Sequence, residues 1–600
     1  MESATTTIAT TNATGASTTT TDVDAATTTR IVSAPGKMLM AGGYLVLDPN
    51  EIGLVIGVNA RFYSSCSIMT KQYPTVSSTT RCPNQIKIRV VSIQFQHEWN
   101  YIWDYSTFQL QEVVVKDDKQ QQDDDVGEGE MESNSAKPPP EKKNPFLEKA
   151  LRIVLLYIYH PNNIHNFSSN HHHYQTRITS MTIQIVGDND FYSLVPHLQQ
   201  RQLQKHQVYE LPKCLPIVYK NDNSTGDIYK TGLGSSACLV TAVIGSILLT
   251  SFNTAATTTP TTTIPTVSSV VNSNHDGTSL QTEQQRVIER LSQIGHCYAQ
   301  GKIGSGFDVA AAMYGSHIYQ RFDPTILTNL LSILDHPTTN TTNDITTTNT
   351  NTTTSSSSSR VMNALYDVVH DNEAWKSNTI EPITCFAPKT FLQVMMADVS
   401  GGSESPSMAK QVLQWRSNYV TEQHQQQQGI DVSDIKVLHW DDLSIINRQI
   451  IHTLQQIHTL VPTADCELQQ LYMDIPSDEW MCRIEHTTLT ELLLSLKELY
   501  IQQRYHMKQM GIIAGNVPIE PDIQTSLCND VTSYVRGVIA TMVPGAGGYD
   551  AISILYLNHP TVHVNITNYL SNYIPQNVCA LTVQGVSYND GLRIETQFPI

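Results

Sequence analysis

The stretch Lys230-Thr231-Gly232-Leu233-Gly234-Ser235-Ser236-Ala237-Cys238 decides how the rest of this 600-residue chain is interpreted. An uncharged, proline-free apolar run from Leu239 to Leu249 follows it, and its length predicts a buried helix rather than a strand. The glycines allow a tight turn and a close approach to a ligand. Ser235 and Ser236 stand where that helix begins, so unpaired N–H groups face outward. This arrangement is typical of a phosphate site, although a loop that merely caps a core helix fits the isolated motif equally well.

The loop is not of the Walker type. No G-x-x-x-x-G-K-[ST] occurs in the chain, and the glycine loop, H-R-D and D-F-G set of the protein kinases is also absent. Nucleotide chemistry would therefore need another phosphate-binding design.

Three further segments have a similar composition. Ser33 to Leu47 places Lys37 in a small-residue turn flanked by apolar, strand-like residues. Gly301 to Asp308 follows a helix and puts a carboxylate at the mouth of a second glycine turn. Val543 to Ala551 forms a third glycine loop.

Together these segments resemble the signature motifs of the GHMP small-molecule kinases, and within that class they look like the eukaryotic-type phosphomevalonate kinase family. The matching segments span roughly residues 31 to 555 and therefore cover the folded chain. They are Gly42-Gly43-Tyr44-Leu45-Val46-Leu47, Lys230 to Ala237, Gly304-Ser305-Gly306-Phe307-Asp308, Ser403-Glu404-Ser405-Pro406-Ser407-Met408 and Pro544-Gly545-Ala546-Gly547-Gly548-Tyr549-Asp550.

The pattern of elements alone predicts a mixed α+β protein. Helices are expected at 145–158, 287–300, 406–415 and 492–507, and strands at 182–186 and 391–399. The resemblance implies a two-domain GHMP fold with the active site in the cleft between the domains. An N-terminal ATP-binding domain like ribosomal protein S5 domain 2 would cover 30–385, and a ferredoxin-like domain would cover 386–600.

The resemblance also implies roles for residues of the first loop. The ATP phosphates would bind to Lys230, Gly232, Leu233, Gly234, Ser235, Ser236 and Ala237. The hydroxyl of Ser235 or Ser236 would hold Mg²⁺, which prefers a few protein oxygens together with substrate phosphates. Cys238 falls inside the helix, where the resemblance implies an alanine, and we expect this change to have no effect on function.

Lys37 and Asp308 are the predicted catalytic pair. Lys37 would stabilise charge on the transferred phosphoryl group, although a lysine at a strand end has the same local sequence. Asp308 would face the acceptor, or simply cap the helix that begins at Val309. A phosphate monoester with a second pKa of about 6 is mostly dianionic at pH 7 and needs no general base. Asp308 is therefore expected to orient Lys37 and the metal.

An acceptor that is itself a phosphate requires a second anion site. The candidate is Gly401 to Ser407, where a helix begins, with Ser403, Ser405 and Ser407 as ligands. Gly545, Gly547 and Gly548 are predicted to contribute from the third loop. Lys410, Arg504 and Lys508 are weaker candidates, because each fits a solvated surface charge.

The chain differs from the mevalonate kinases at two places that bear on the acceptor. Those enzymes carry a glutamate upstream of the aspartate as a metal ligand, and this chain has Gly295-His296-Cys297-Tyr298 in that region. They also end the first motif in Gly-Glu-His, where this chain has Gly42-Gly43-Tyr44. Both argue against mevalonate as the acceptor, for which the resemblance implies 5-phosphomevalonate, and the first leaves the second Mg²⁺ ligand unassigned. Another GHMP kinase, such as mevalonate kinase, and a non-catalytic GHMP-fold sensor remain as alternatives.

Composition limits the partners and the compartment. A formal charge of −18 argues against general nucleic-acid or membrane-surface binding. We expect no membrane insertion, because by this interpretation no apolar stretch approaches the length needed to span a bilayer. The ten cysteines show no zinc spacing, and the N-terminus lacks a signal-peptide core, so we expect free thiols and a cytoplasmic location. A monomer and a homodimer fit equally well.

Several tracts cannot bury enough apolar surface to offset the entropy of ordering. Residues 1–29 form a Thr/Ala-rich tail, and the insertions 116–143, 253–279 and 337–359 are rich in polar residues. We expect all four to be disordered.

Overall fold

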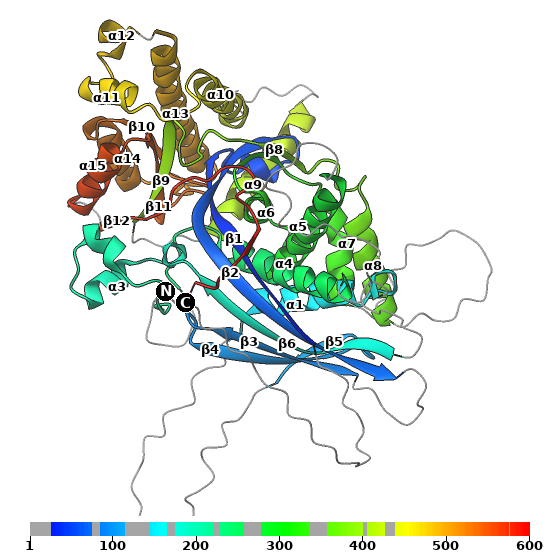
Figure 1. Cartoon of the computed structure of the whole chain (residues 1–600). Coiled ribbons are helices and arrows are strands. Elements are labelled where there is room, and N and C mark those ends of the chain that lie inside the picture. Colours follow the sequence, from blue (N-terminus) through cyan, green and yellow to red (C-terminus); the bar gives the residue numbers. More distant parts are fainter. Residues whose placement is uncertain are drawn as a thin grey trace, which may run out of the picture.

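The computed structural model of the chain describes residues 26–74, 84–113, 143–164, 174–219, 228–256, 278–336, 357–399, 405–426, 438–485, 487–574 and 577–599. These residues form two sheets covered by helices (Figure 1). The predicted mixture of helices and strands is confirmed.

A nine-stranded sheet forms the first part of the molecule. Its path runs β13-β1-β2-β6-β3-β4-β5, while β7 pairs with β2 and β8 with β7. The described strands pair antiparallel except for β3 and β6. The strands are β1 (Ala26–Ala41), β2 (Ile52–Pro74), β3 (Gln85–Ser92), β4 (His97–Asp104), β5 (Gln109–Glu112), β6 (Tyr174–Gly187), β7 (His317–Gln320), β8 (Thr379–Pro382) and β13 (Arg593–Glu595).

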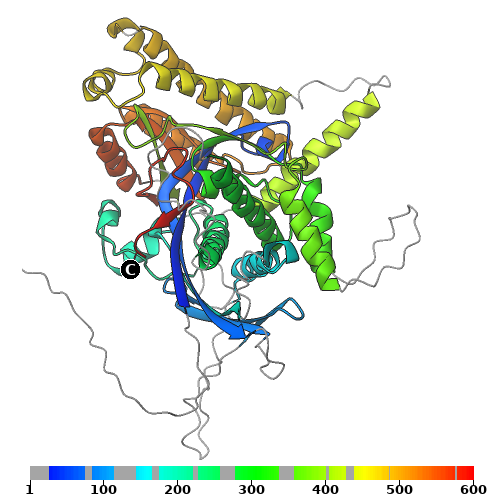
Figure 2. The ribbon, with the colours of Figure 1, turned by 45° about the vertical axis from the view of Figure 1, so that its right-hand side comes forward.

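Helices cover one face of this sheet, which curves around them (Figures 1 and 2). Helix α4 packs directly on β1 and β2, and α1 and α5 pack on α4. Asn144 caps α1 by accepting a hydrogen bond from the Leu147 N–H at 3.2 Å, as its sequence indicates. The helices are α1 (Pro145–Ile158), α2 (Pro161–Ile164), α3 (Val195–Gln200), α4 (Ser235–Ala256), α5 (Thr278–Gln300), α6 (Phe307–Tyr314), α7 (Thr325–Asp335) and α8 (Ser357–His370).

Helix α4 confirms the buried helix predicted for Leu239 to Leu249 and corrects the expectation about membrane-spanning length. Its window Ser235–Phe252 has 18 residues and a mean hydropathy of 1.8, which is long and apolar enough to cross a bilayer. Within the protein 78% of that window is buried. The helix is apolar all round because the sheet lies on one side and α1 and α5 lie on others.

A four-stranded antiparallel sheet forms the second part, in the order β10-β11-β9-β12. Along the chain its elements run strand, helices, two strands, helix, strand. The strands are β9 (Leu392–Val399), β10 (Val538–Met542), β11 (Ala551–Leu557) and β12 (Val578–Ala580). The helices are α9 (Ser405–Gln426), α10 (Leu438–Leu460), α11 (Cys466–Asp474), α12 (Trp480–Arg483), α13 (Thr487–Ile513), α14 (Asp522–Tyr534) and α15 (Pro560–Ser571).

The end of the chain returns to the first sheet. The predicted domain boundary at residue 386 did not include this return, because it assigned all of 386–600 to the second domain. Strand β13 pairs with β1, and Glu595 accepts a hydrogen bond from Ser33 at 2.5 Å. The buried guanidinium of Arg61 donates to the carbonyls of Asp590 and Gly591. The segment after β12 therefore packs with the N-terminal elements.

The polar tracts lie mostly outside the described residues, and their predicted limits are wrong at the edges. Residues 26–29 belong to β1, 253–256 to α4, 278–279 to α5 and 357–359 to α8. At Thr27 to Thr29 the side chains are polar, but the backbone pairs with β2 from Met69 to Ser67. Pairing with an existing strand supplies the stability that the composition lacks.

Candidate active site

Three chain segments meet at the loop that precedes α4. Gly232 and Gly234 have φ angles of +81° and +82°, a conformation that glycine adopts without strain. A β-carbon on Gly234 would lie 3.4 Å from Lys37 Cε and 3.7 Å from Asp308 Cβ. The loop, the predicted catalytic lysine and the predicted catalytic aspartate are thus in one place.

Lys37 lies inside β1 and not in a turn as expected. The register between β1 and β2 shifts between Pro35 and Lys37, and such a bulge re-aims the side chain that follows it. The Lys37 N–H donates to the Leu233 carbonyl at 3.0 Å, and its ammonium donates to the Gly232 carbonyl at 2.6 Å. Burial lowers the pKa of Lys37, and the nearby Asp308 opposes that shift. The bulge therefore fixes a lysine charge against the glycine loop.

Cys238 lies inside α4 as expected, and its side chain contacts β1. Its buried thiol donates to the Pro35 carbonyl at 3.0 Å. The carbonyl that accepts this bond lies where the register between β1 and β2 shifts. Cys238 thereby ties the start of α4 to the strand that carries Lys37.

The two serines of the loop have different surroundings. Ser235 is buried, and its side chain is hydrogen-bonded to Tyr192. Ser236 is partly exposed, and its hydroxyl lies 3.1 Å from His296 Nε2. Of the two predicted metal ligands, Ser236 is therefore the one that faces the other site residues.

His296 connects Ser236 to Asp308. Its Nε2 lies 3.8 Å from an Asp308 oxygen and 3.2 Å from Gln300 Nε2, and its ring packs 5.5 Å from Phe146. Burial lowers the pKa of His296, Asp308 opposes the shift, and Lys230 and Lys302 add to it. In the sequence, His296 stands in the region where mevalonate kinases carry a glutamate, and no local signal indicates its contacts.

Asp308 is not the N-cap of its helix. Helix α6 begins at Phe307 and is capped by Gly306, whose φ is +84°. Asp308 lies in the first turn, with its side chain about one-fifth exposed. Asp308 is therefore not at the cap position, but its Oδ1 accepts a hydrogen bond from the Val309 N–H at 3.0 Å and so satisfies one N–H of the first turn, as a capping side chain does.

Side chains from α5 and β7 hold the second glycine turn. Gln293 donates to the Gly306 carbonyl at 2.9 Å, and the Tyr319 hydroxyl donates to the Ser305 carbonyl at 2.9 Å. Arg321 donates to the carbonyls of Gly304 and Leu47, both at 2.6 Å. The turn is therefore fixed before any ligand binds.

Gly306→Ala is expected to destabilise the protein by about 2–4 kcal/mol, from left-handed strain and overpacking together. The new β-carbon would lie 2.7 Å from the Tyr319 hydroxyl and 2.8 Å from Phe322 Cε1. The matched control is Gly301→Ala, which has φ +65° but no described atom within 4 Å of the β-carbon. Calorimetric and urea midpoints of both variants measure the difference. Equal shifts would show that the packing around Gly306 does not matter.

A cleft of about 830 Å³ opens beside Asp308. That volume suits a small-molecule site. Its walls come from both parts of the molecule and include Tyr44, the second glycine turn, α9 and the third glycine loop. Lys302 and Lys410 line it, so cations gather here in a chain with a net charge of −18.

Only part of the predicted acceptor-phosphate segment can be placed. Ser403 lies outside the described residues, and of Ser405 only the backbone is described, as the first residue of α9. Ser407 lies in the first turn of α9 and lines the cleft.

The third glycine loop presents one glycine to the cleft. Gly545 lines it, while Gly547 packs against the Ile519 carbonyl and the Gly548 N–H donates to that carbonyl at 2.9 Å. The Tyr44 hydroxyl donates to the Ala546 carbonyl at 2.6 Å and joins the first motif to this loop. Packing gives Gly547 and Gly548 a structural role, and their contact with substrate stays a prediction.

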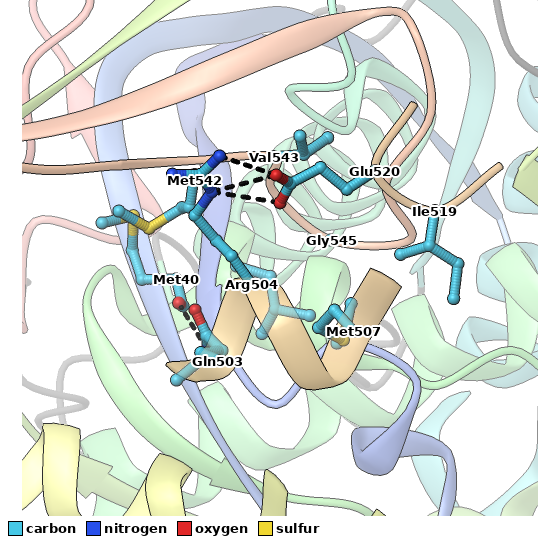
Figure 3. A pocket seen from close by; sticks show the side chains of 12 residues that line it. Met40, Gln503, Arg504, Met507, Ile519, Glu520, Met542, Val543 and Gly545 are labelled. Atoms are coloured by element: carbon cyan, nitrogen blue, oxygen red, sulfur yellow. Dashed lines mark hydrogen bonds and ion pairs between the residues drawn. The ribbon is translucent and has the colours of Figure 1, made fainter. Parts of the chain in front are cut away.

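Arg504 is a buried ion-paired residue, not a solvated charge. It donates to Glu520 at 2.7 Å, and the two side chains are 10% and 4% exposed (Figure 3). The pair borders a cavity of about 20 Å³, which has room for about one water. Lys508 pairs with the exposed Asp522 at 2.6 Å. Lys410 alone of the three weaker candidates lines the cleft.

The chain is similar in sequence to curated phosphomevalonate kinases. No model of a protein family matches the chain. A phosphomevalonate kinase of Gibberella zeae is 28% identical over 94% of this chain and 96% of its own length. A peroxisomal phosphomevalonate kinase of Arabidopsis thaliana is 27% identical over 88% and 90%, and one from Candida albicans is 26% identical over 88% and 89%. The predicted relationship to the phosphomevalonate kinases is thereby confirmed.

Among solved structures, a Listeria innocua protein aligns with 95% of this chain and all of its own, with a TM-score of 0.50 and 14% sequence identity. This likeness shows a shared fold.

Proposed function

We propose that the protein transfers the γ-phosphoryl group of ATP to 5-phosphomevalonate, giving 5-diphosphomevalonate and ADP. The observation that carries the proposal is the meeting of the glycine loop, Lys37 and Asp308 at Gly234, beside a cleft lined by further lysines. The similarity to phosphomevalonate kinases along nearly the whole chain supports the choice of acceptor.

ATP would place its phosphates on the N–H groups at the start of α4. The first N–H groups of a helix have no carbonyl partner within it, and the helix dipole favours an anion there. Lys37 would lie beside the transferred group, where its charge offsets the negative charge that builds up. Gly232 and Gly234 carry no side chain that would block this approach.

The residues present fit a bound Mg²⁺. The Ser236 hydroxyl and the Asp308 carboxylate are hard oxygen donors that flank His296, and Mg²⁺ commonly takes one or two protein oxygens with substrate phosphates. When bound, the ion would neutralise phosphate charge. Ser235 is the weaker ligand, because its side chain is buried and bonded to Tyr192.

The acceptor supplies its own nucleophile. Its phosphate has a second pKa of about 6 and is mostly dianionic at pH 7, so no protein base has to remove a proton. The task of the site is to bring two polyanions together. Asp308 would hold Lys37 in position, and Lys302, Lys410, Ser407 and Gly545 would receive the acceptor phosphate.

We propose two domains that meet at the cleft. The order of the second sheet, with its strand-helix-strand-strand-helix-strand sequence, supports a ferredoxin-like domain with a helical insertion. The first domain would be of the ribosomal S5 domain 2 type. We also propose a cytoplasmic location; imaging of the chain tagged at either end tests it against the peroxisomal location named for the Arabidopsis relative.

A coupled ADP-release assay tests the proposed reaction. With ATP and Mg²⁺, we expect turnover of 5-phosphomevalonate and little or none of mevalonate, galactose or homoserine. The product should be a diphosphate ester by mass spectrometry. Turnover of mevalonate without turnover of its phosphate would contradict the proposal, and no turnover of any acceptor would favour a non-catalytic role.

A further inference from the structure

Outside the cleft, three metal-ligating side chains point at one another between two helices of the second part. His439 and Asp442 lie one turn apart near the start of α10, and His506 lies on α13, which packs against α10. One ligand atom from each lies within 4.8 Å of both others, and all three side chains are partly buried. We infer that His439, Asp442 and His506 form a binding site for a divalent transition-metal ion of the Zn²⁺ type.

The distances suit such an ion. In a tetrahedral site with bonds of about 2.0–2.1 Å, neighbouring ligand atoms are about 3.4 Å apart. Nδ1 of His439 and Nδ1 of His506 are 2.9 Å apart, and Nδ1 of His506 is 3.5 Å from an Asp442 oxygen. Rotations of the two imidazoles by a few degrees would bring these separations to the required value.

The donor set also favours a cation. Two imidazole rings and one carboxylate converge on one point, and each can offer a lone pair to a metal ion. Imidazole nitrogens with a carboxylate select Zn²⁺ and similar ions over Mg²⁺, which prefers oxygen ligands alone.

The site would connect two helices that support the cleft. The residues next to the ligands, Trp440 and Met507, belong to one buried cluster with Tyr44 and Met408. Tyr44 in turn bonds the third glycine loop. A metal that links α10 to α13 would therefore stabilise this cluster without touching the reacting groups.

Titration of the chelator-treated full chain with Co²⁺ tests the inference. The sequence also contains His171, His172 and His173, which lie outside the described residues, so all proteins are tested with these three changed to alanine. We expect one equivalent of Co²⁺ with the visible absorption of a four-coordinate ion, displaced by Zn²⁺. Zn²⁺ at 100 times its Kd should raise the thermal midpoint by roughly 2 °C.

His506→Ala should weaken Co²⁺ binding by more than about 100-fold, because even loss of an outer partner costs 10–100-fold. Asp442→Asn is the conservative second variant if His506→Ala does not fold. The matched control is His452→Gln, an exposed histidine of α10 outside the cluster, which should bind as the parent does. Weak binding by the parent, or equal binding by all variants, would show that the three side chains only hydrogen-bond to one another.

Discussion

Lys37→Met is expected to lower kcat by about 10²–10³, the usual effect of removing one preorganised charge donor from a transition state. The ammonium lies 2.6 Å from the Gly232 carbonyl and 5.3 Å from the centre of the Phe307 ring, so its position is fixed before ATP binds. Methionine has a similar length and fills the same space without the charge. Steady-state kinetics with saturating ATP and acceptor measure the loss.

Two controls separate chemistry from folding. The thermal midpoint of Lys37→Met should stay close to that of the parent, because the backbone contact of Lys37 with Leu233 does not depend on the side chain. Lys376→Met removes an exposed lysine and should leave kcat unchanged. A kcat within about threefold of the parent for Lys37→Met would remove Lys37 from the catalytic residues.

Lys37→Arg gives a third measurement. Burial lowers the pKa of Lys37 below that of an exposed lysine, so the parent enzyme should lose this charge, and with it kcat/KM, as the pH rises through the lowered value. Arginine stays charged at all accessible pH values. The variant should therefore be slow but should not show that alkaline decline.

The sequence predicted the local structures of the site better than their contacts. The apolar run after Ser236, the capped helix at Asn144 and the strand at 391–399 all follow from periodicity and capping residues, which are local signals. The bulge at Pro35 to Lys37 was not predicted, because it depends on the pairing of β1 with β2 and on the Leu233 carbonyl. When the pairing with β2 and the contact with Leu233 are unknown, a lysine between small residues predicts a turn.

The same reason accounts for the contacts that the sequence did not indicate. His296 is separated by 60 residues from Ser236, and the Arg504–Glu520 pair lies among residues of the third glycine loop, β10 and α14. The return of β13 to β1 joins the two ends of the chain. Each of these depends on tertiary packing, which no periodicity or composition records.

Asp308→Asn is expected to lower kcat by about 10²-fold through loss of positioning, the size that a small misplacement of reacting groups produces. Asp308 lies near Lys37 and His296 and accepts a hydrogen bond from the Val309 N–H, contacts that fit a positioning role. The acidic limb of the kcat/KM profile should then belong to the acceptor phosphate. As the pH falls through about 6, the acceptor gains a proton and kcat/KM falls tenfold for each further pH unit.

The pH profile of Asp308→Asn distinguishes the two roles of the carboxylate. If the acceptor titrates, the acidic limb persists in the variant at its lower rate, and it moves when an acceptor analogue with a different second pKa replaces 5-phosphomevalonate. A limb that came from His296 would behave differently: Asp308 raises the pKa of His296 against the effect of burial, so removing the Asp308 charge should move such a limb to lower pH. A limb that is present in the parent and disappears in Asp308→Asn would instead identify Asp308 as the titrating base, and the dianionic acceptor would not be the nucleophile that the site requires.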